Sequence, residues 1–350
     1  MAYSTISKPE LHFNTVTYTG NATSRSITGV GFQPDFTWIK NRDSGSLWHQ
    51  LQDAVRGAGK NLYSNNTNAE ADAAGAALTS FDSDGFTIGT GNGVNGSGNN
   101  IVSWNWKAAN SSGSSNSDGS ITSTVSVNTT AGFSIVTYTG NGSAASFGHG
   151  LSTPDIVLIK DRTDAGNSWY FHTTAIDGSE DYLTLENNNT KSDAASGYSI
   201  GASVYNLGGG GTWVNMNSKN YVAYCFKQIK GYSNFGSYVG NGNADGPFVY
   251  TGFKPALVII KDTTTSGTGH SWCLWDNKRS TFNPTTQLLL PNEADSEYTL
   301  TDPIDFLSNG FKIRDTNGSR NDSGSTYFYM AFAKEPLVAN VGASIPATAR

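Results

Sequence analysis

The sequence predicts an all-β protein made of three tandem antiparallel β-sandwich domains of the jelly-roll or concanavalin-like kind. The 350 residues include 40 Gly, and Asn, Ser and Thr are abundant throughout, a composition that favours turns over long helices. The apolar runs are short, rich in β-branched and aromatic residues, and bounded by Gly, Asn, Asp or Pro, as strands are. In addition, one strand-and-turn sequence occurs three times.

The repeated stretch opens with VTYTGN at 16–21, which recurs unchanged at 136–141 and in altered form as SYVGNG at 237–242. Each copy then runs through an apolar segment, introduced by a proline, that ends on a lysine, and it closes on a second strand rich in aromatic residues. The aligned prolines and lysines are Pro34, Pro154 and Pro255, and Lys40, Lys160 and Lys261. Self-similarity of about 100 residues is too long for a solenoid repeat and predicts domains, each with its own core.

These matches place the three repeats at about 13–109, 133–228 and 232–335. The predicted domains are a first sandwich at 1–109, a flexible linker and lead-in strand at 110–132, a second sandwich at 133–230, a third at 231–336 and a C-terminal tail at 337–350. The composition of ANSSGSSNSDG at 109–119 is typical of a flexible linker, so we expect the first domain to move freely. The second and third follow each other directly and should form a semi-rigid pair.

Within each repeat the strands differ in how much of them should be buried. IVLIK at 156–160 and LVIIK at 257–261 are nearly continuous apolar runs, which predicts central strands covered on both faces. FNTVTYT at 13–19 mixes polar and apolar positions and predicts a half-exposed strand. A proline cannot donate a hydrogen bond within a central ladder, so each aligned proline should mark the start of its strand.

Composition excludes several classes of function. The formal net charge is -6, and the longest basic run is the pair Lys278 and Arg279, so we expect no nucleic-acid partner. The first residues do not have the pattern of a secretion signal, and no apolar run approaches the roughly 20 residues of a membrane span. We therefore expect synthesis in a cytoplasm and no membrane insertion. Cys225 and Cys273 are too few for a disulfide framework, and Cys225 should be a core residue.

Motifs for catalysis or metal binding are scarce. The five histidines are scattered with no two at metal-ligand spacing, so we expect no metal site and no cofactor: they are His12, His49, His149, His172 and His270. No nucleophile elbow, Cys-His pair or phosphate-binding loop occurs, and we expect no enzyme. A glycan-cleaving pair of carboxylates stays a lesser alternative. Its candidates follow the tryptophan-bearing strands: Asp53, Asp177, Glu180 and Asp181.

Aromatic residues are the better candidates for a binding site, because flat apolar rings suit the C-H faces of sugars. Trp48, Trp169 and Trp272 recur in the three repeats, which favours core positions over a contact surface. Trp213 follows the glycine run at 208–211 and has no repeat partner, so we predict an exposed glycan platform, or equally a lid over the sandwich edge. The nearby Tyr205 and Asn206 complete the predicted ligand-binding set.

Several long phrases resemble a known group of proteins. They are FNTVTYTGN, GFQPDFTWIKNR, DAVRG, GFTIGTGNGVNGSGNNIVSWNWKA, FSIVTYTGNG, FGSYVGNGNADGPFVYTGF and IDFLSNGFKIR. These phrases resemble the tandem repeated domains of structural proteins from marine tailed bacteriophages, which are usually described as tail fibre or lectin-like, concanavalin-type sandwiches. The similarity runs from about residue 3 to 336. It implies a virion component, made in the host cytoplasm, whose partners are other virion proteins.

Three functions stay open at this stage. The first is a tail-fibre or appendage protein that adheres to a host-surface glycan through Trp213 and its neighbours. The second is a capsid decoration, cement or connector protein without a ligand. The third is a glycan-cleaving depolymerase that depends on Asp177 or Glu180. The chain has no collagen-like, heptad or short-period β-helix repeat, so it should be a knob or decoration rather than a shaft. By analogy with phage appendages we expect a homo-oligomer, specifically a trimer.

Overall fold

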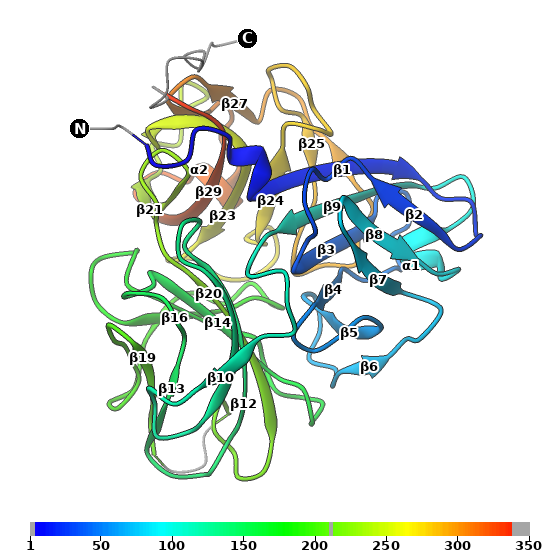
Figure 1. Ribbon diagram of the computed structural model, residues 1–350. Coiled ribbons are helices and arrows are strands. Elements are labelled where there is room, and N and C mark those ends of the chain that lie inside the picture. The colour runs from blue at the N-terminus through cyan, green and yellow to red at the C-terminus, as the bar shows by residue number, and fades with distance from the viewer. Residues whose placement is uncertain (1–3, 210–212, 338–350) are drawn as a thin grey trace.

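The computed structural model describes residues 4–209 and 213–337, which contain almost only strands and turns (Figure 1). The described chain has two four-residue helices and one short 3-10 helix, which are α1 (Asn92–Asn95), α2 (Gly318–Asn321) and η1 (Pro9–Leu11). The prediction of an antiparallel all-β fold is confirmed. Among these residues, no helix has the length and apolar character needed to cross a membrane.

The first repeat, which we call unit 1 (13–109), has a main sheet of six strands and a second sheet of three. The main sheet runs in the order β1 (Phe13–Thr19), β9 (Asn100–Trp106), β3 (Phe36–Asn41), β4 (Gln50–Asp53), β5 (Lys60–Tyr63) and β6 (Ala71–Asp72). The second sheet runs in the order β2 (Arg25–Thr28), β8 (Gly85–Ile88) and β7 (Leu78–Asp82).

Unit 2 (133–228) repeats this plan, and its main sheet is extended by β10 and β11 from the preceding segment. Its order is β10 (Ser114–Asn116), β11 (Ser123–Asn128), β12 (Phe133–Thr139), β20 (Asn220–Phe226), β14 (Ile156–Asp161), β15 (Tyr170–Thr173), β16 (Asp181–Thr184) and β17 (Ser192–Asp193). The second sheet has the order β13 (Ala145–Gly148), β19 (Val204–Leu207) and β18 (Ser199–Ile200).

Unit 3 (232–335) has a main sheet of four strands, a second sheet of three and a separate two-stranded sheet. The main sheet has the order β21 (Ser233–Val239), β29 (Thr326–Pro336), β23 (Phe253–Asp262) and β24 (Cys273–Asp276). The others are β22 (Phe248–Tyr250), β28 (Gly310–Ile313) and β27 (Ile304–Leu307), and β25 (Gln287–Leu288) with β26 (Tyr298–Thr299). Pro255 lies inside β23 and not before it, and the ladder tolerates it because the register shifts at this residue.

The segment 110–132 is not a flexible linker. It contains β10 and β11, and β11 pairs along its length with β12, so the lead-in strand was predicted correctly and the flexibility was not. Asp35 also holds the start of the segment, because its Oδ2 accepts hydrogen bonds from the backbone N–H groups of Ala108 and Asn110. A composition rich in Ser, Asn and Gly allowed an edge hairpin as well as a linker.

The central strands β14 and β23 are buried on both faces, as their apolar runs predicted, and β1 is half-exposed, as its mixed pattern predicted. In β14, Val157 and Ile159 point outward into a core between the main and second sheets of unit 2. Ile156 and Leu158 point the opposite way, into a second core. Unit 1 and unit 3 have their own outer cores of the same kind, centred on Phe86 and on Phe311. Each unit is therefore sandwich-like.

The inner faces of the three main sheets share one core, so the expectation of three separate domains with separate cores is wrong. One hydrophobic cluster contains Trp104 of unit 1, Leu158 and Tyr224 of unit 2, and Ile259 and Trp272 of unit 3. Aromatic contacts cross every boundary: the ring centroids are 4.3 Å apart for Phe36 and Tyr224, 5.3 Å for Phe171 and Trp272, and 5.2 Å for Phe13 and Phe332. Free movement of unit 1 is excluded by these contacts.

The three aligned lysines help to hold the units together. Each is fully buried, and its ammonium donates to a backbone carbonyl of a different unit: Lys40 to Ala294, Lys160 to Thr67, and Lys261 to Asn188. The three acceptors occupy equivalent places in the repeats: Thr67 follows β5, Asn188 follows β16 and Ala294 follows β25. The contacts therefore run in a cycle, from unit 1 to unit 3, from unit 3 to unit 2 and from unit 2 to unit 1. Burial lowers the pKa of each lysine to about 8.

A second set of bonds follows the same cycle. The indole N–H of Trp169 donates to the carbonyl of Tyr63 at 2.8 Å, and that of Trp272 donates to the carbonyl of Thr184 at 3.1 Å. Two of the three junctions also carry charge pairs, Arg42 with Glu297 at 2.6 Å and Arg162 with Glu70 at 2.9 Å. At the third junction these positions hold Thr263 and Lys191, which are linked through their backbones.

Candidate functional site

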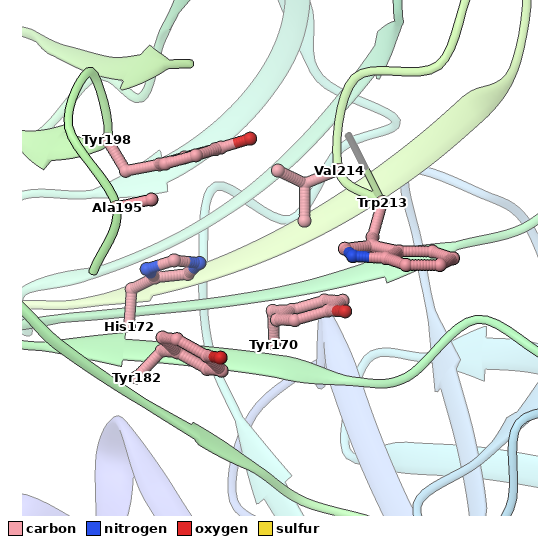
Figure 2. A pocket seen from close by; sticks show the side chains of 7 residues that line it. All are labelled: Tyr170, His172, Tyr182, Ala195, Tyr198, Trp213 and Val214. Carbon is pink, nitrogen blue, oxygen red and sulfur yellow. The ribbon is translucent and has the colours of Figure 1, made fainter. Parts of the chain in front are cut away.

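The candidate site is a cavity of about 170 Å³ on unit 2, walled mostly by aromatic rings (Figure 2). Its lining residues are Tyr170, His172, Tyr182, Ala195, Tyr198, Trp213 and Val214. In Figure 2 the His172 imidazole lies between Tyr182 and Tyr198 at one end of the cavity, and Trp213 lies at the other end beside Tyr170. Trp213 is 58% exposed, so the cavity has an aromatic rim that solvent and ligands can reach.

Strand geometry brings these side chains together. Successive residues of a strand point to opposite faces, so Tyr170 and His172 of β15 project outward while Phe171 between them packs in the shared core. β16 pairs with β15 so that Tyr182 lies directly opposite His172. The loops before β18 and before β20 then contribute Tyr198 and Trp213 from the other side.

The rings form a continuous set of contacts. The Tyr170 and Tyr182 centroids are 5.7 Å apart, those of His172 and Tyr182 are 5.9 Å apart, and His172 stacks on Tyr198 at 5.9 Å with an interplanar angle of 19°. Such ring-to-ring packing holds the wall rigid, because each aromatic side chain has few rotatable bonds and is braced by its neighbours. A rigid wall reduces the entropy lost when a ligand binds.

His172 is the buried polar side chain of this cavity. It is only 4% exposed, and within the described chain neither ring nitrogen has a hydrogen-bond partner. Burial lowers the pKa of the imidazole to about 3, so the ring is neutral near pH 7 and offers one N–H donor and one nitrogen acceptor. A buried polar side chain without partners costs stability, and this cost is recovered when a ligand supplies the missing hydrogen bonds.

The predicted ligand-binding residues are only partly brought together. Trp213 lines the cavity. Tyr205 does not, because β19 directs it into the outer core, where it is fully buried and its ring packs against His172 at 5.3 Å. Asn206 points to the other face of β19 and donates to the hydroxyl of Ser199 at 2.9 Å. Of the three residues predicted to bind a ligand, the cavity lining therefore contains Trp213 but neither Tyr205 nor Asn206.

The sequence contained a signal for the residues that were missed. Tyr170 and His172 alternate with Phe171, and the corresponding outward positions are Gln50 and Gln52 in unit 1 and Cys273 and Trp275 in unit 3. Only the second copy therefore places two aromatic rings at these two positions of the strand face. Aligning the repeats position by position would have revealed the difference.

The structure buries two of the three recurring tryptophans and exposes the third. Trp169 and Trp272 are buried in the shared core as predicted, but Trp48 is 41% exposed. The residue directly before β4 in unit 1 is His49, which is buried where units 2 and 3 have tryptophan. The repeat was therefore aligned one residue out of register at this point.

The carboxylates considered for glycan cleavage have structural partners. Asp53 is buried in an ion pair with Arg56. Lys191 bridges Asp177 at 2.6 Å and Asp181 at 2.8 Å, and its hydrogen bond with Asp177 holds the pKa of that carboxyl well below its usual range. Glu180 accepts from the backbone of Ile200 at 2.7 Å, and burial raises its pKa. These contacts give Asp53 a structural partner in unit 1 and give Asp177, Glu180 and Asp181 structural partners in unit 2.

Unit 3 contains a second group of chemically active side chains. Asp262, His270 and Asp322 each place one potential metal ligand atom within 4.8 Å of the others. The fold brings these residues together from three separate segments, which sequence spacing did not predict.

Comparison with known proteins gives a family but no activity. The family described as "Domain of unknown function (DUF7483)" matches residues 8–336, so a single family model spans all three units. No curated protein and no solved structure matches the chain.

Proposed function

Because the chain belongs to the DUF7483 family, for which no function is described, we propose its function from the aromatic cavity: unit 2 binds a host-surface glycan, and the protein is a lectin-like component of a bacteriophage particle. The observation that carries the proposal is the unpartnered, buried His172 inside a wall of tyrosines with an exposed tryptophan at its rim.

The chemistry of this wall suits a sugar. The faces of Trp213 and Tyr170 are apolar and can stack on the C-H face of a pyranose ring. His172 can exchange hydrogen bonds with a hydroxyl, which both donates and accepts. The cavity is smaller than the roughly 300–1,000 Å³ of sites for drug-sized ligands. It therefore suits one terminal sugar residue of a polymer and not a long segment.

The placement on a phage particle depends on the sequence resemblance described above. Within this proposal, the units are concanavalin-like sandwiches, the protein acts by binding and not by catalysis, and the particle supplies its protein partners. A tail fibre or appendage is preferred over a head decoration because an adhesin needs a ligand cavity, whereas a cement protein does not.

Sugar binding is tested with a glycan array followed by titration of the selected sugar against the intrinsic tryptophan fluorescence. We expect binding by the native protein and a loss of about 5- to 30-fold in affinity for Trp213→Ala, since one stacked ring contributes about 1–2 kcal/mol. Trp48→Ala is the matched control, because Trp48 is an exposed tryptophan on unit 1 away from the cavity. Equal binding by native protein and Trp213→Ala would contradict the proposal.

The particle location is tested separately by immunogold electron microscopy of virions with an antibody against this chain. Gold at the tail tip or appendages is expected. Gold spread over the head would indicate a capsid decoration protein and contradict the proposed adhesin. Particles without gold would contradict the proposal that the chain is a virion component.

A further inference from the structure

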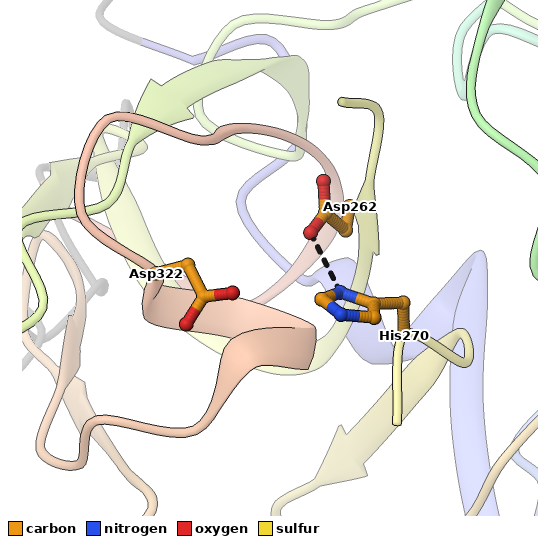
Figure 3. A group of neighbouring side chains, drawn as sticks. All are labelled: Asp262, His270 and Asp322. Carbon is orange, nitrogen blue, oxygen red and sulfur yellow. Dashed lines mark hydrogen bonds and ion pairs between the residues drawn. The ribbon is translucent and has the colours of Figure 1, made fainter. Parts of the chain in front are cut away.

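We propose that unit 3 contains a binding site for a first-row divalent metal ion, such as Zn²⁺ or Mn²⁺, formed by Asp262, His270 and Asp322 (Figure 3). This site is independent of the aromatic cavity, which belongs to unit 2. The proposal uses three residues from three segments: the end of β23, the loop before β24 and the residue that follows α2.

The first argument is geometric. The Asp262 Oδ2 atom lies 2.9 Å from His270 Nδ1, and all three potential ligand atoms lie within 4.8 Å of one another. With metal-ligand bonds of about 2.1 Å, adjacent ligands of an octahedral ion are about 3 Å apart and opposite ligands about 4.2 Å apart. An ion could therefore bind after side-chain adjustments of a few tenths of an ångström. In Figure 3 the carboxylate of Asp322 and the imidazole of His270 both face Asp262.

The second argument is charge. Asp262 is completely buried, and the described chain gives the carboxylate of Asp322 no hydrogen bond and no ion pair. Lys261 is the adjacent cation, but its ammonium donates to the backbone carbonyls of Asn188, Asp262 and His270. Two carboxylates held close together repel each other, and a divalent cation between them would remove this repulsion.

The third argument is the fixed orientation of Asp262. Its Oδ1 atom accepts hydrogen bonds from the backbone N–H groups of Thr264 and Thr265 and from the hydroxyl of Thr264, which leaves Oδ2 directed at the cluster. Hydrogen bonds of this kind orient a metal ligand and are part of a working metal site. The half-buried His270 and Asp322 leave room on the solvent side for water to complete the coordination.

The other units provide an internal comparison. Asp161 of unit 2 corresponds to Asp262 and makes the same turn, but its Oδ2 accepts from the amide of Asn167 at 2.8 Å. The position that corresponds to Asp322 follows Asn215 and is Met216 in unit 2. The turn is therefore made without a histidine or a second carboxylate, so neither is needed for folding of the turn. An imidazole with two carboxylates favours Zn²⁺ or Mn²⁺ over the oxygen-liganded Ca²⁺ and Mg²⁺.

The test is isothermal titration of the metal-free full chain with ZnCl₂, MnCl₂ and CaCl₂ in separate runs, with Mn²⁺ binding also followed by electron paramagnetic resonance. We expect one Zn²⁺ or Mn²⁺ per chain, a higher melting temperature with the metal, and weak or no Ca²⁺ binding. Asp322→Asn should weaken binding by about tenfold or more. The control is Asp193→Asn, which removes a carboxylate that is 89% exposed and outside the cluster.

His270→Gln provides a second variant, because glutamine can still donate to Asp262 but does not supply an imidazole. Circular dichroism without metal must match the native protein for either variant to be used. No binding of Zn²⁺ or Mn²⁺ by the native chain, or native affinity in both variants, would overturn the site. Tighter binding of Ca²⁺ than of Zn²⁺ and Mn²⁺ would overturn the assigned class of metal.

Discussion

Replacing Tyr224 by phenylalanine tests whether the three units unfold as one body. Tyr224 belongs to unit 2 and is fully buried, but its hydroxyl donates to Asp53 Oδ2 of unit 1 at 2.7 Å and accepts from Arg56 Nη2 at 3.0 Å. The substitution removes one oxygen atom and leaves the ring in the shared core. It therefore perturbs the junction between the units with little change in packing.

The size of the effect follows from these contacts. A hydrogen bond to a charged group contributes about 1.5–3 kcal/mol, so the two bonds together set an upper bound of about 3–6 kcal/mol. Asp53 and Arg56 keep their own ion pair in the variant, which retains part of this free energy. We expect Tyr224→Phe to lower the free energy of unfolding by about 2–4 kcal/mol.

The assay is urea unfolding followed by both tryptophan fluorescence and far-ultraviolet circular dichroism. One coincident transition is expected, shifted to lower urea in Tyr224→Phe, because the shared core couples all three units. Tyr298→Phe is the matched control, since this tyrosine is 43% exposed and bonds only to Asp295 of its own unit. Separate transitions for the units, or a shift no larger than that of the control, would refute the reasoning.

Two further predictions concern buried titratable groups. Lys160→Met should destabilise the fold by about 2–4 kcal/mol, because it removes the hydrogen bonds from the buried ammonium to the carbonyls of Thr67 and Asp161, and Thr67 keeps only its bond from the backbone N–H of Gly166. Thermal unfolding checks this against the half-exposed Lys334→Met, and equal stability of the two variants would contradict it. His172 has its folded pKa lowered to about 3, so the unfolded chain binds the proton first and stability should fall as the pH decreases from about 6.5 toward 3. His172→Phe should flatten this part of the pH profile of urea unfolding, and an imidazole pKa near 6.5 measured by NMR would exclude the effect.

The sequence was informative wherever a local pattern determined the structure. The strand character of IVLIK and LVIIK, their burial on both faces and the repeated order of strands were all predictable, because period and composition reflect burial directly. The three aligned lysines were visible as well. Their role was not, because each one bonds to a carbonyl of another unit and no single repeat contains both partners.

The site was less predictable for the same reason. Trp213 stood out because it interrupts the repeat, but the partners that surround it depend on strand register and on which face of β19 is turned inward. A nearby position in the sequence suggested Tyr205, whereas proximity in the fold selects Tyr170, His172 and Tyr198. The metal cluster likewise combines Asp262 and His270 with Asp322, which is 52 or more residues further along the chain.

Unit 2 has the aromatic cavity, and the matching positions hold Gln50 and Gln52 in unit 1 and Cys273 and Trp275 in unit 3. Under the proposed function, this difference sets the number of sugar sites per chain. Under the proposed function, the described residues of three similar units offer one aromatic sugar site and not three, so a single molecule would gain no avidity from its repeats. If the chain is an adhesin of a phage particle as proposed, firm attachment to a cell surface would have to come from the number of copies on one particle and from the spacing between them. The strength of adhesion would be a property of the assembly, with each chain contributing one weak and rapidly reversible contact.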